Sequence, residues 1–275
     1  MICEICWLHL VLTNSLMQKI GMMKMIIIGR SFMLTTKTKP ILLQPAWKLP
    51  ANIRAVISTR NNEFNLATHV NDDPNKVMAN RQQLRNFLPS DPFWLQQTHS
   101  TRVVKADLSK AVPDADASYT TDKGIVCAVM TADCLPILLT NASGDFVAAI
   151  HAGWRGLNND IIAQTILKLS QFSPNDMLAF IGPAINQECF EIGKEVRESF
   201  LATDTAIAPF FIPSINNEKF MADLRGIAEY KLYKSGLLPQ NITNPKICTK
   251  CNHNWFFSYR ENPNTGRMAS LIWKE

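Results

Sequence analysis

The sequence has little that would mark a membrane protein or a nucleic-acid-binding protein. It contains no stretch of about 18 apolar residues without polar breaks, the length that a transmembrane helix needs. Its net charge of +5 is small for 275 residues and is not gathered into a dense basic run. We therefore expect a protein that neither crosses a membrane nor binds nucleic acid, although local arginines could still hold an anionic substrate.

The cysteines do not have the pattern of a disulfide framework. A secreted scaffold of this kind is usually short and has an even number of cysteines. This chain has seven, scattered along 275 residues. We expect reduced thiols in a cytoplasmic protein, some of which bind metal. The cysteines are Cys3, Cys6, Cys127, Cys134, Cys189, Cys248 and Cys251.

Residues 1–32 lack the logic of a signal peptide. Their first apolar run, from Cys6 to Leu12, is preceded by Glu4, whereas a signal peptide would have basic residues there and a small-residue cleavage site after the run. We expect these residues to be an extension outside the fold or the product of a misassigned start. A short membrane-associating helix is the alternative. Residues 33–275 are then expected to form a single catalytic domain.

The rest of the sequence predicts a layered fold. Apolar runs at 124–130, 136–140 and 146–150 are short, rich in β-branched residues and bounded by turn residues, which predicts strands buried on both faces. Further strands are expected at 54–59, 102–105, 178–183, 246–249 and 268–273, and helices at 74–88, 158–171, 192–202 and 222–235. Strands and helices mix without strict alternation. The predicted fold class is therefore α/β, a single layered domain with mixed β-sheets and a site at the strand ends.

Three side chains that commonly ligate metals stand close to the ends of these segments. His99 opens one segment, Cys134 follows the strand at 124–130, and His151 follows the strand at 146–150. Three protein ligands leave one coordination position for water or substrate, which is the pattern of catalytic zinc sites. The residues alone leave two other interpretations open, a cysteine–histidine nucleophilic pair and ordinary buried side chains.

A set of sequence strings narrows these choices. In chain order they are STRNNEFNLATHVNDDPNKVMANR, QTHS, TADCLPILL, AAIHAGWRG, IGPAI followed by CFEIG, DLRG, and FFSYRENPNTGRMASLIW. Together, from about residue 51 to 274, they resemble the laccase-domain family, also called polyphenol oxidase-like proteins. The resemblance implies a single α/β domain in which His99, Cys134 and His151 bind one metal ion. The chain departs from the family pattern after Arg60, where a glycine-rich turn is replaced by NNE.

The resemblance also implies an activity and a cofactor. The family is associated with zinc-dependent purine nucleoside phosphorolysis, adenosine deamination and methylthioadenosine phosphorolysis, and its members were first described as copper phenol oxidases. A multicopper cluster needs many histidines, and this chain has five. Zinc with an open position suits group transfer and hydrolysis. We therefore expect zinc, with copper as the alternative, and a purine nucleoside and phosphate as partners.

Three residues in these motifs are candidates for catalysis. Phosphate recognition requires arginines, for which Arg60 and Arg155 are the candidates, although Arg155 could equally form a structural ion pair. Deamination needs a carboxylate that moves protons, and Asp133 is adjacent to Cys134, although it could instead orient a ligand.

An alternative function is a hydrolase that edits peptidoglycan precursors, with Cys134 as its nucleophile or a metal at the same site.

One further motif has the spacing of half a zinc knuckle. It consists of Cys248, Cys251 and His253. The pair Cys3 and Cys6 could supply the other half of a structural zinc site. Unliganded loop cysteines are the alternative interpretation.

Overall fold

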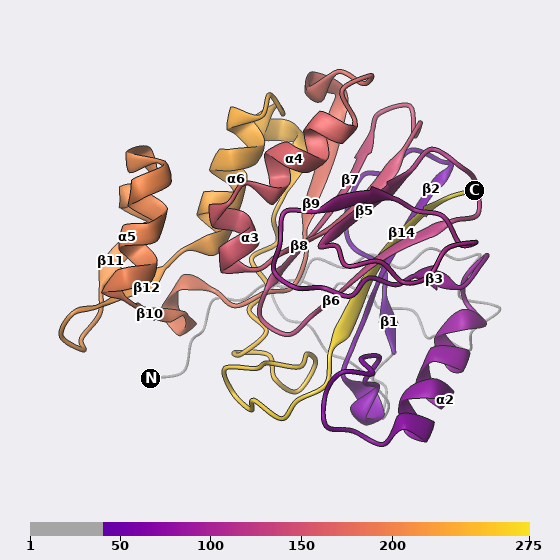
Figure 1. The fold of residues 1–275 in the computed structure, drawn as a ribbon, viewed down its shortest axis with the longest axis horizontal. Coiled ribbons are helices and arrows are strands. Elements are labelled where there is room, and N and C mark those ends of the chain that lie inside the picture. The colour runs from indigo at the N-terminus through magenta and orange to yellow at the C-terminus, as the bar shows by residue number, and fades with distance from the viewer. Residues whose placement is uncertain (1–40) are drawn as a thin grey trace, which may run out of the picture.

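The structure, a computed structural model, describes residues 41–275, and within this range the strands form three sheets (Figure 1). The five-stranded sheet consists of β1 (Leu42–Leu43), β2 (Ile53–Ser58), β3 (Pro92–Phe93), β6 (Val126–Thr131) and β14 (Met268–Lys274), in the order β1-β2-β14-β6-β3. The six-stranded sheet consists of β4 (Val103–Lys105), β5 (Ala117–Thr120), β7 (Leu135–Asn141), β8 (Val147–Ala152), β9 (Met177–Ile181) and β13 (Ile242–Thr243), in the order β13-β9-β7-β8-β5-β4. The small third sheet consists of β10 (Glu191–Gly193), β11 (Phe211–Pro213) and β12 (Lys219–Ala222), with β12 in the middle.

Helices cover the outer faces of the two large sheets (Figure 1). Their bounds are α2 (Pro74–Arg85), α3 (Trp154–Asn158), α4 (Ile161–Lys168), α5 (Lys194–Thr203) and α6 (Leu224–Lys234). Helix α2 packs on the five-stranded sheet, and α3, α4 and α6 pack on the six-stranded sheet. Helix α5 and the small sheet form a projection at one end of the molecule (Figure 1). The sequence therefore folds into helix, sheet, sheet and helix layers.

The central strands are apolar on both faces because each face meets a different layer. In β7, Leu138 packs between the two sheets, whereas Ile137 and Leu139 pack toward the helices. In β6, Cys127 packs between the sheets, and Ala128 packs toward α2. Burial of one such leucine or isoleucine side chain contributes about 1.5–3 kcal/mol. This explains why these strands read as almost continuous apolar runs.

The predicted fold class is confirmed, and most of the predicted elements are present. The mixed character of the sheets is visible in the parallel pairs β3–β6, β4–β5 and β9–β13 among antiparallel neighbours. The N-terminal cap of α2 is Asp73, whose side chain accepts a hydrogen bond from the backbone N–H of Asn75. A polar cap of this kind stabilises a helix by about 1 kcal/mol.

One predicted helix is shorter than expected, and one predicted strand is wrong. The helix expected at 158–171 is present as α4, from Ile161 to Lys168. It begins only after Asp160, whose left-handed backbone with φ 72° separates it from α3. The strand expected at 246–249 is a loop, which pairs only through one bridge between Ala184 and Cys248. The carbonyl of Ile247 in this segment also accepts a hydrogen bond from the side chain of Arg225 in α6.

The expected extension at residues 1–32 lies outside the described residues, so the boundary of the domain at residue 33 stays a prediction. Within residues 41–275, no helix combines the length and apolar character that spanning a bilayer requires.

Candidate metal centre

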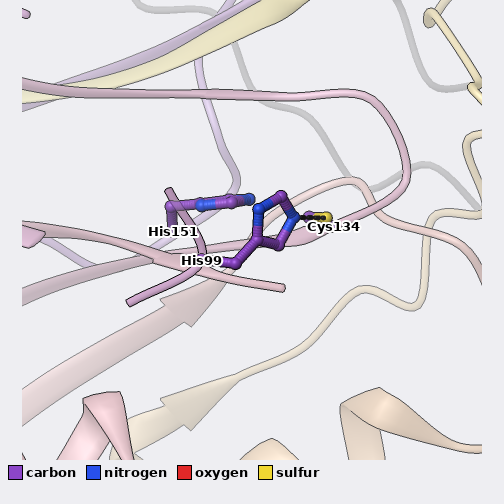
Figure 2. A group of neighbouring side chains, drawn as sticks. All are labelled: His99, Cys134 and His151. Carbon is purple, nitrogen blue, oxygen red and sulfur yellow. Dashed lines mark hydrogen bonds between the residues drawn. The ribbon is translucent and has the colours of Figure 1, made fainter. Parts of the chain in front are cut away.

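The fold brings together the three side chains that the sequence selected as metal ligands. His99 lies in the loop between β3 and β4, Cys134 in the connection from β6 to β7, and His151 in β8. One ligand atom from each residue lies within 4.8 Å of the other two. Figure 2 shows the imidazole of His99 directed at the sulfur of Cys134, with the ring of His151 beside it. The Cys134 Sγ and His99 Nε2 atoms are 3.7 Å apart, and the two imidazole rings meet edge to face with centroids 4.8 Å apart.

The site forms where the chain passes from one large sheet to the other. Strand β6 belongs to the five-stranded sheet and β7 to the six-stranded sheet, so the residues between them bridge the two layers. Asp133, directly before Cys134, adopts a left-handed backbone with φ 87°, and His99 does the same with φ 61°. Left-handed backbone is uncommon for residues other than glycine and is found where surrounding contacts fix it. Both ligand-bearing loops are therefore held in specific conformations.

Gly153 makes room for the three ligands. A Cβ atom at this position would lie 2.5 Å from Cδ2 of His99 and 3.2 Å from Sγ of Cys134. Real Cβ atoms do not make contacts as short as the first of these, so a larger residue would displace His99. The glycine that follows β8 is thus required by the close packing of the ligand side chains.

The buried carboxylate of Asp116 organises both histidines. It accepts hydrogen bonds from the backbone N–H groups of Thr98, His99 and Ser100 at 3.2, 3.0 and 2.6 Å, and from the Ser100 hydroxyl at 2.7 Å. Nδ1 of His151 lies 2.7 Å from the same carboxylate. Burial opposes its ionisation, but the hydrogen bonds from His151 and Ser100 and the charge of His151 lower the pKa of Asp116 to about 2.

This contact fixes which nitrogen of His151 can bind a metal. Because the carboxylate accepts the proton on Nδ1, Nε2 is the nitrogen available to the site, where a metal ion would replace its proton. Hydrogen bonding of the second ring nitrogen to a carboxylate is the common arrangement for histidines that ligate zinc. Sequence reasoning missed Asp116, since nothing in the local pattern distinguishes it from Asp114 two residues earlier.

The electrostatics of the site favour a cysteine thiolate. Burial opposes ionisation of the Cys134 thiol, but the positive charge of His151 and hydrogen bonds from both histidines lower its pKa to about 6. Burial likewise opposes a charge on His151, whereas the Cys134 thiolate and Asp116 raise the pKa of the imidazole to about 9. The thiolate is the form of cysteine that binds metals. Two nitrogen donors and one sulfur donor around one point fit a zinc or copper ion.

Three hydrogen bonds from other parts of the protein hold the carboxylate of Asp133, the residue predicted to move protons. Its carboxylate accepts from the hydroxyls of Thr249 at 2.6 Å and Ser258 at 3.1 Å, and from the backbone N–H of Arg260 at 2.7 Å. Asp133 is buried. It therefore ties the C-terminal loop, residues 248–260, to the residue next to Cys134.

The two arginines predicted to hold phosphate lie in different settings. Arg60 forms an ion pair with Glu63 and donates to the carbonyl of His253 at 2.9 Å. Arg155 is exposed and its guanidinium lies 4.4 Å from the centroid of the Trp154 ring. Both arginines thus already have partners within the protein, Glu63 and His253 for Arg60 and the Trp154 ring for Arg155.

Two further residues near the centre were not singled out by sequence reasoning. Partial burial lowers the pKa of Arg267, and the negative charges of Cys134 and Asp133 act on it in the opposite direction. Burial and the positive charges of Arg267, Arg81 and His151 lower the pKa of His69. Both residues belong to strings that carry the family resemblance, NLATHV and TGRMAS, which was the available signal.

The chain belongs to the family described as multi-copper polyphenol oxidoreductase laccase, whose model matches residues 53–275. A purine nucleoside phosphorylase of Pseudomonas aeruginosa is 40% identical over 239 residues, which cover 84% of this chain and 97% of that protein. The purine nucleoside phosphorylase YfiH of Escherichia coli K12 is 41% identical over 243 residues, covering 84% of this chain and 98% of that protein.

Solved structures agree with this assignment. The crystal structure of a Neisseria meningitidis protein is similar with a TM-score of 0.80 and 40% identity, over 86% of this chain and all of that one. The structure of a hypothetical protein YfiH from Bacillus licheniformis is similar with a TM-score of 0.76 and 25% identity, over 86% of this chain and 97% of that one. The predicted family membership is confirmed.

Proposed function

We propose that this chain is a zinc-dependent purine nucleoside phosphorylase. The observation that carries the proposal is the His99, Cys134 and His151 cluster, in a chain that covers nearly the full length of relatives named purine nucleoside phosphorylases. Three ligands leave a position at which a substrate oxygen or nitrogen can approach. Copper stays the alternative metal, because the family description names it.

The reaction requires an anion site beside a site for the nucleoside. An oxygen of phosphate bonds to the anomeric carbon of the ribose, the bond from that carbon to the base nitrogen breaks, and the base leaves with a proton. A metal ion held by the three ligands would act as a Lewis acid that stabilises developing negative charge. The protein must supply the rest, namely orientation of both substrates and a donor for the phosphate oxygens.

Arg267 is the arginine that we favour for phosphate. It is partly buried, and the charges of Cys134 and Asp133 act on it. Its guanidinium donates to the carbonyls of Thr265 at 2.7 Å and Gly266 at 3.0 Å through Nη1, which holds the side chain in one orientation. Arg155 and Arg60 are proposed as outer contributors, since Arg155 lies on the surface and Arg60 is paired with Glu63.

We assign Asp133 a positioning role in preference to proton transfer. The hydrogen bonds printed for its carboxylate all come from protein groups of the loop 248–260. To move a proton at the substrate, the carboxylate would have to leave these partners. We propose adenosine deamination as a secondary activity. Because the carboxylate of Asp133 is occupied, a group other than Asp133 would transfer the proton in that reaction.

A turnover assay on the full chain tests the proposal. Zinc-loaded protein is supplied with inosine, adenosine or methylthioadenosine, with and without phosphate, and the released base and sugar phosphate are separated by chromatography. We expect base release that depends on phosphate and on zinc. Conversion of adenosine to inosine without phosphate would add the deaminase activity.

The assay also separates the alternatives. Failure of all three nucleosides, together with cleavage of a peptidoglycan-precursor amide by metal-free protein, would replace the proposal with a hydrolase in which the Cys134 thiolate is the nucleophile. Oxidation of phenols by copper-loaded protein, without nucleoside turnover, would favour the oxidase.

The phosphate site is tested by Arg267→Lys, with Arg155→Lys for comparison. Lysine keeps the charge but loses the planar pair of donors. A charge-assisted hydrogen bond is worth about 1.5–3 kcal/mol, so we expect the KM for phosphate to rise about 10- to 100-fold in Arg267→Lys. The KM for nucleoside and the zinc content should change little. A larger effect of Arg155→Lys would show that the exposed arginine is the phosphate ligand.

A further inference from the structure

Three cysteines outside the metal centre form a second cluster of possible metal ligands. Cys189 ends the single-turn helix Gln187–Cys189, and Cys248 and Cys251 lie in the loop before β14. Their sulfur atoms lie within 4.8 Å of one another. The sulfurs of Cys189 and Cys251 are 3.3 Å apart. The proposed function uses none of these thiols.

The loop that carries two of the thiols is fixed by hydrogen bonds of its own. The backbone of Ala184 pairs with this loop, donating to the carbonyl of Ile247 at 3.1 Å and accepting from the N–H of Thr249 at 3.0 Å. The side chain of Arg225 donates to the carbonyl of Ile247 at 2.6 Å. The side chain of Asn252 donates to the carbonyl of Cys248 at 2.8 Å. The two sulfurs of the Cys248–Cys251 turn are thereby placed on the same side of the loop as Cys189.

The turn itself has the geometry of a metal-binding turn. The N–H of Cys251 is directed at the sulfur of Cys248, at 3.4 Å. Such a contact stabilises negative charge on the sulfur, because a hydrogen bond to an ionised acceptor is stronger than one to a neutral acceptor. Two cysteines separated by two residues are the usual spacing in zinc sites, with further ligands from a distant segment. Here the distant ligand is Cys189, from a different part of the chain.

The three sulfur atoms lie within 4.8 Å of one another, close enough to share one cation. Three thiolates at these distances would repel one another, and three thiols can form only weak S–H hydrogen bonds. A divalent cation removes the repulsion by replacing the protons, which is the usual coupling of metal binding to thiol ionisation.

We propose that Cys189, Cys248 and Cys251 bind one zinc ion at a site separate from the His99, Cys134 and His151 centre. Thiolate ligands select zinc or monovalent copper over harder cations. Cys251 is exposed and Cys189 half-buried, so an ion can enter and a water molecule can complete the coordination. His253 does not belong to the cluster, and its Nδ1 lies 3.2 Å from the carbonyl of Lys250.

The site differs from the one that the sequence predicts. The motif Cys248, Cys251 and His253 predicts half a zinc knuckle completed by Cys3 and Cys6. The structure places Cys189 beside Cys248 and Cys251 instead. Cys3 and Cys6 lie outside the described residues, and the proposed site does not require them.

A zinc ion here would have a structural consequence at the first centre. Thr249 lies between the two loop cysteines in the sequence and donates to Asp133 at 2.6 Å. Ser258 and the N–H of Arg260, farther along the same loop, contact the same carboxylate. An ion that holds Cys248 and Cys251 to Cys189 would therefore hold the loop that positions Asp133, next to Cys134.

Metal counting on the reduced full chain tests the proposal without any activity assay. Metal-free protein is incubated with excess zinc, separated from free metal by gel filtration and analysed for zinc per chain. We expect two zinc ions in the unchanged protein, one in Cys251→Ser and one in Cys134→Ser. Cys189→Ser should match Cys251→Ser, and the double variant with Cys134→Ser should retain none.

The absorption spectrum of the protein with Co²⁺ is an independent measurement, because cobalt bound by thiolates absorbs in the near ultraviolet. The Cys134→Ser variant, which keeps only the second cluster, should still show this band on addition of Co²⁺, and Cys251→Ser should lose the larger part of it. A variant in which Cys3 and Cys6 are both serine should keep two zinc ions and the full band.

Three results would overturn the proposal. The first is two zinc ions in Cys251→Ser, and the second is loss of an ion in the variant without Cys3 and Cys6. The third is a disulfide between Cys189 and Cys251, found by peptide mapping after incubation of the reduced protein with zinc and with no gain of metal. Failure of nucleoside turnover would not affect these counts, so the outcome is independent of the proposed function.

Discussion

Replacement of Asp116 by asparagine tests the reasoning about the metal centre most directly. Asp116→Asn preserves the size of the side chain and removes its charge. One oxygen of the carboxylate accepts from His99 N–H and His151 Nδ1, and the other accepts from Thr98 and Ser100. An amide has only one oxygen, so one of these two groups must face an NH₂ donor.

Either orientation of the amide is unfavourable. If the NH₂ group faces Ser100 and Thr98, two backbone donors and a hydroxyl lose their acceptor, and leaving a buried donor unsatisfied costs about 1–3 kcal/mol. If it faces His151, Nδ1 must become an acceptor and Nε2 then carries the proton. In that tautomer Nε2 cannot bind a metal ion.

We therefore expect Asp116→Asn to weaken zinc binding by about 10- to 100-fold, the usual effect of losing a carboxylate behind a ligating histidine. This corresponds to about 1.4–2.7 kcal/mol. Competition with a chromophoric chelator measures the affinity, and thermal unfolding with and without zinc separates it from an effect on the fold. Asp114→Asn is the matched control, since it makes the same change at an exposed position two residues away.

Two results would refute the role given to Asp116. Zinc affinity of Asp116→Asn within about threefold of the unchanged protein, a difference of less than 1 kcal/mol, would mean that the tautomer of His151 does not depend on Asp116. An equal loss in Asp114→Asn would indicate a general charge effect.

Three further predictions concern the same centre and the limits of the domain. Gly153→Ala should lower zinc affinity by about 10-fold or more, because the added Cβ would lie 2.5 Å from Cδ2 of His99 and overpacking of this kind typically costs 1–3 kcal/mol; chelator competition that shows no loss would contradict the close packing. Cys134→Ala should abolish nucleoside turnover and remove one bound zinc, whereas Cys127→Ala, in the apolar layer between the sheets, should keep both and only lower the unfolding temperature; elemental analysis and turnover decide between them. A chain that begins at Met33 should fold and keep its turnover, and insolubility of that chain would mean that the preceding residues pack on the domain.

The layered fold could be predicted because its pattern is local. The runs at 124–130, 136–140 and 146–150 are almost wholly apolar, and each became a strand covered on both faces. The break between α3 and α4 could not be predicted in the same way, because it depends on the left-handed backbone of Asp160. Asp160 also pairs with Lys231 of α6 at 2.9 Å, a contact that is distant in the sequence.

The three ligands were identified by residue type and by family resemblance, whereas their support was not. Cys134 and His151 end apolar runs, which made them visible in the sequence. Asp116 stands before a short, polar strand that no pattern indicates, and its importance comes from the loop at Thr98 to Ser100 folding onto it. Partners that meet only through tertiary structure leave no periodic signal in the chain.

The loop 248–260 illustrates how the fold connects separate motifs into one arrangement. The strand predicted at 246–249 is reduced to one bridge with Ala184, and Arg225 donates to the carbonyl of Ile247 beside it. That loop presents Thr249 to Asp133, and the left-handed backbone of Asp133 turns Cys134 toward the histidines. Since a thiol ligand is useful only in a fixed position, the geometry of Cys134 depends on a loop more than a hundred residues later in the chain. The family strings TADCLP and FFSYR therefore occur together in this sequence for a physical reason, because Asp133 in the first accepts hydrogen bonds from Ser258 and Arg260 in the second.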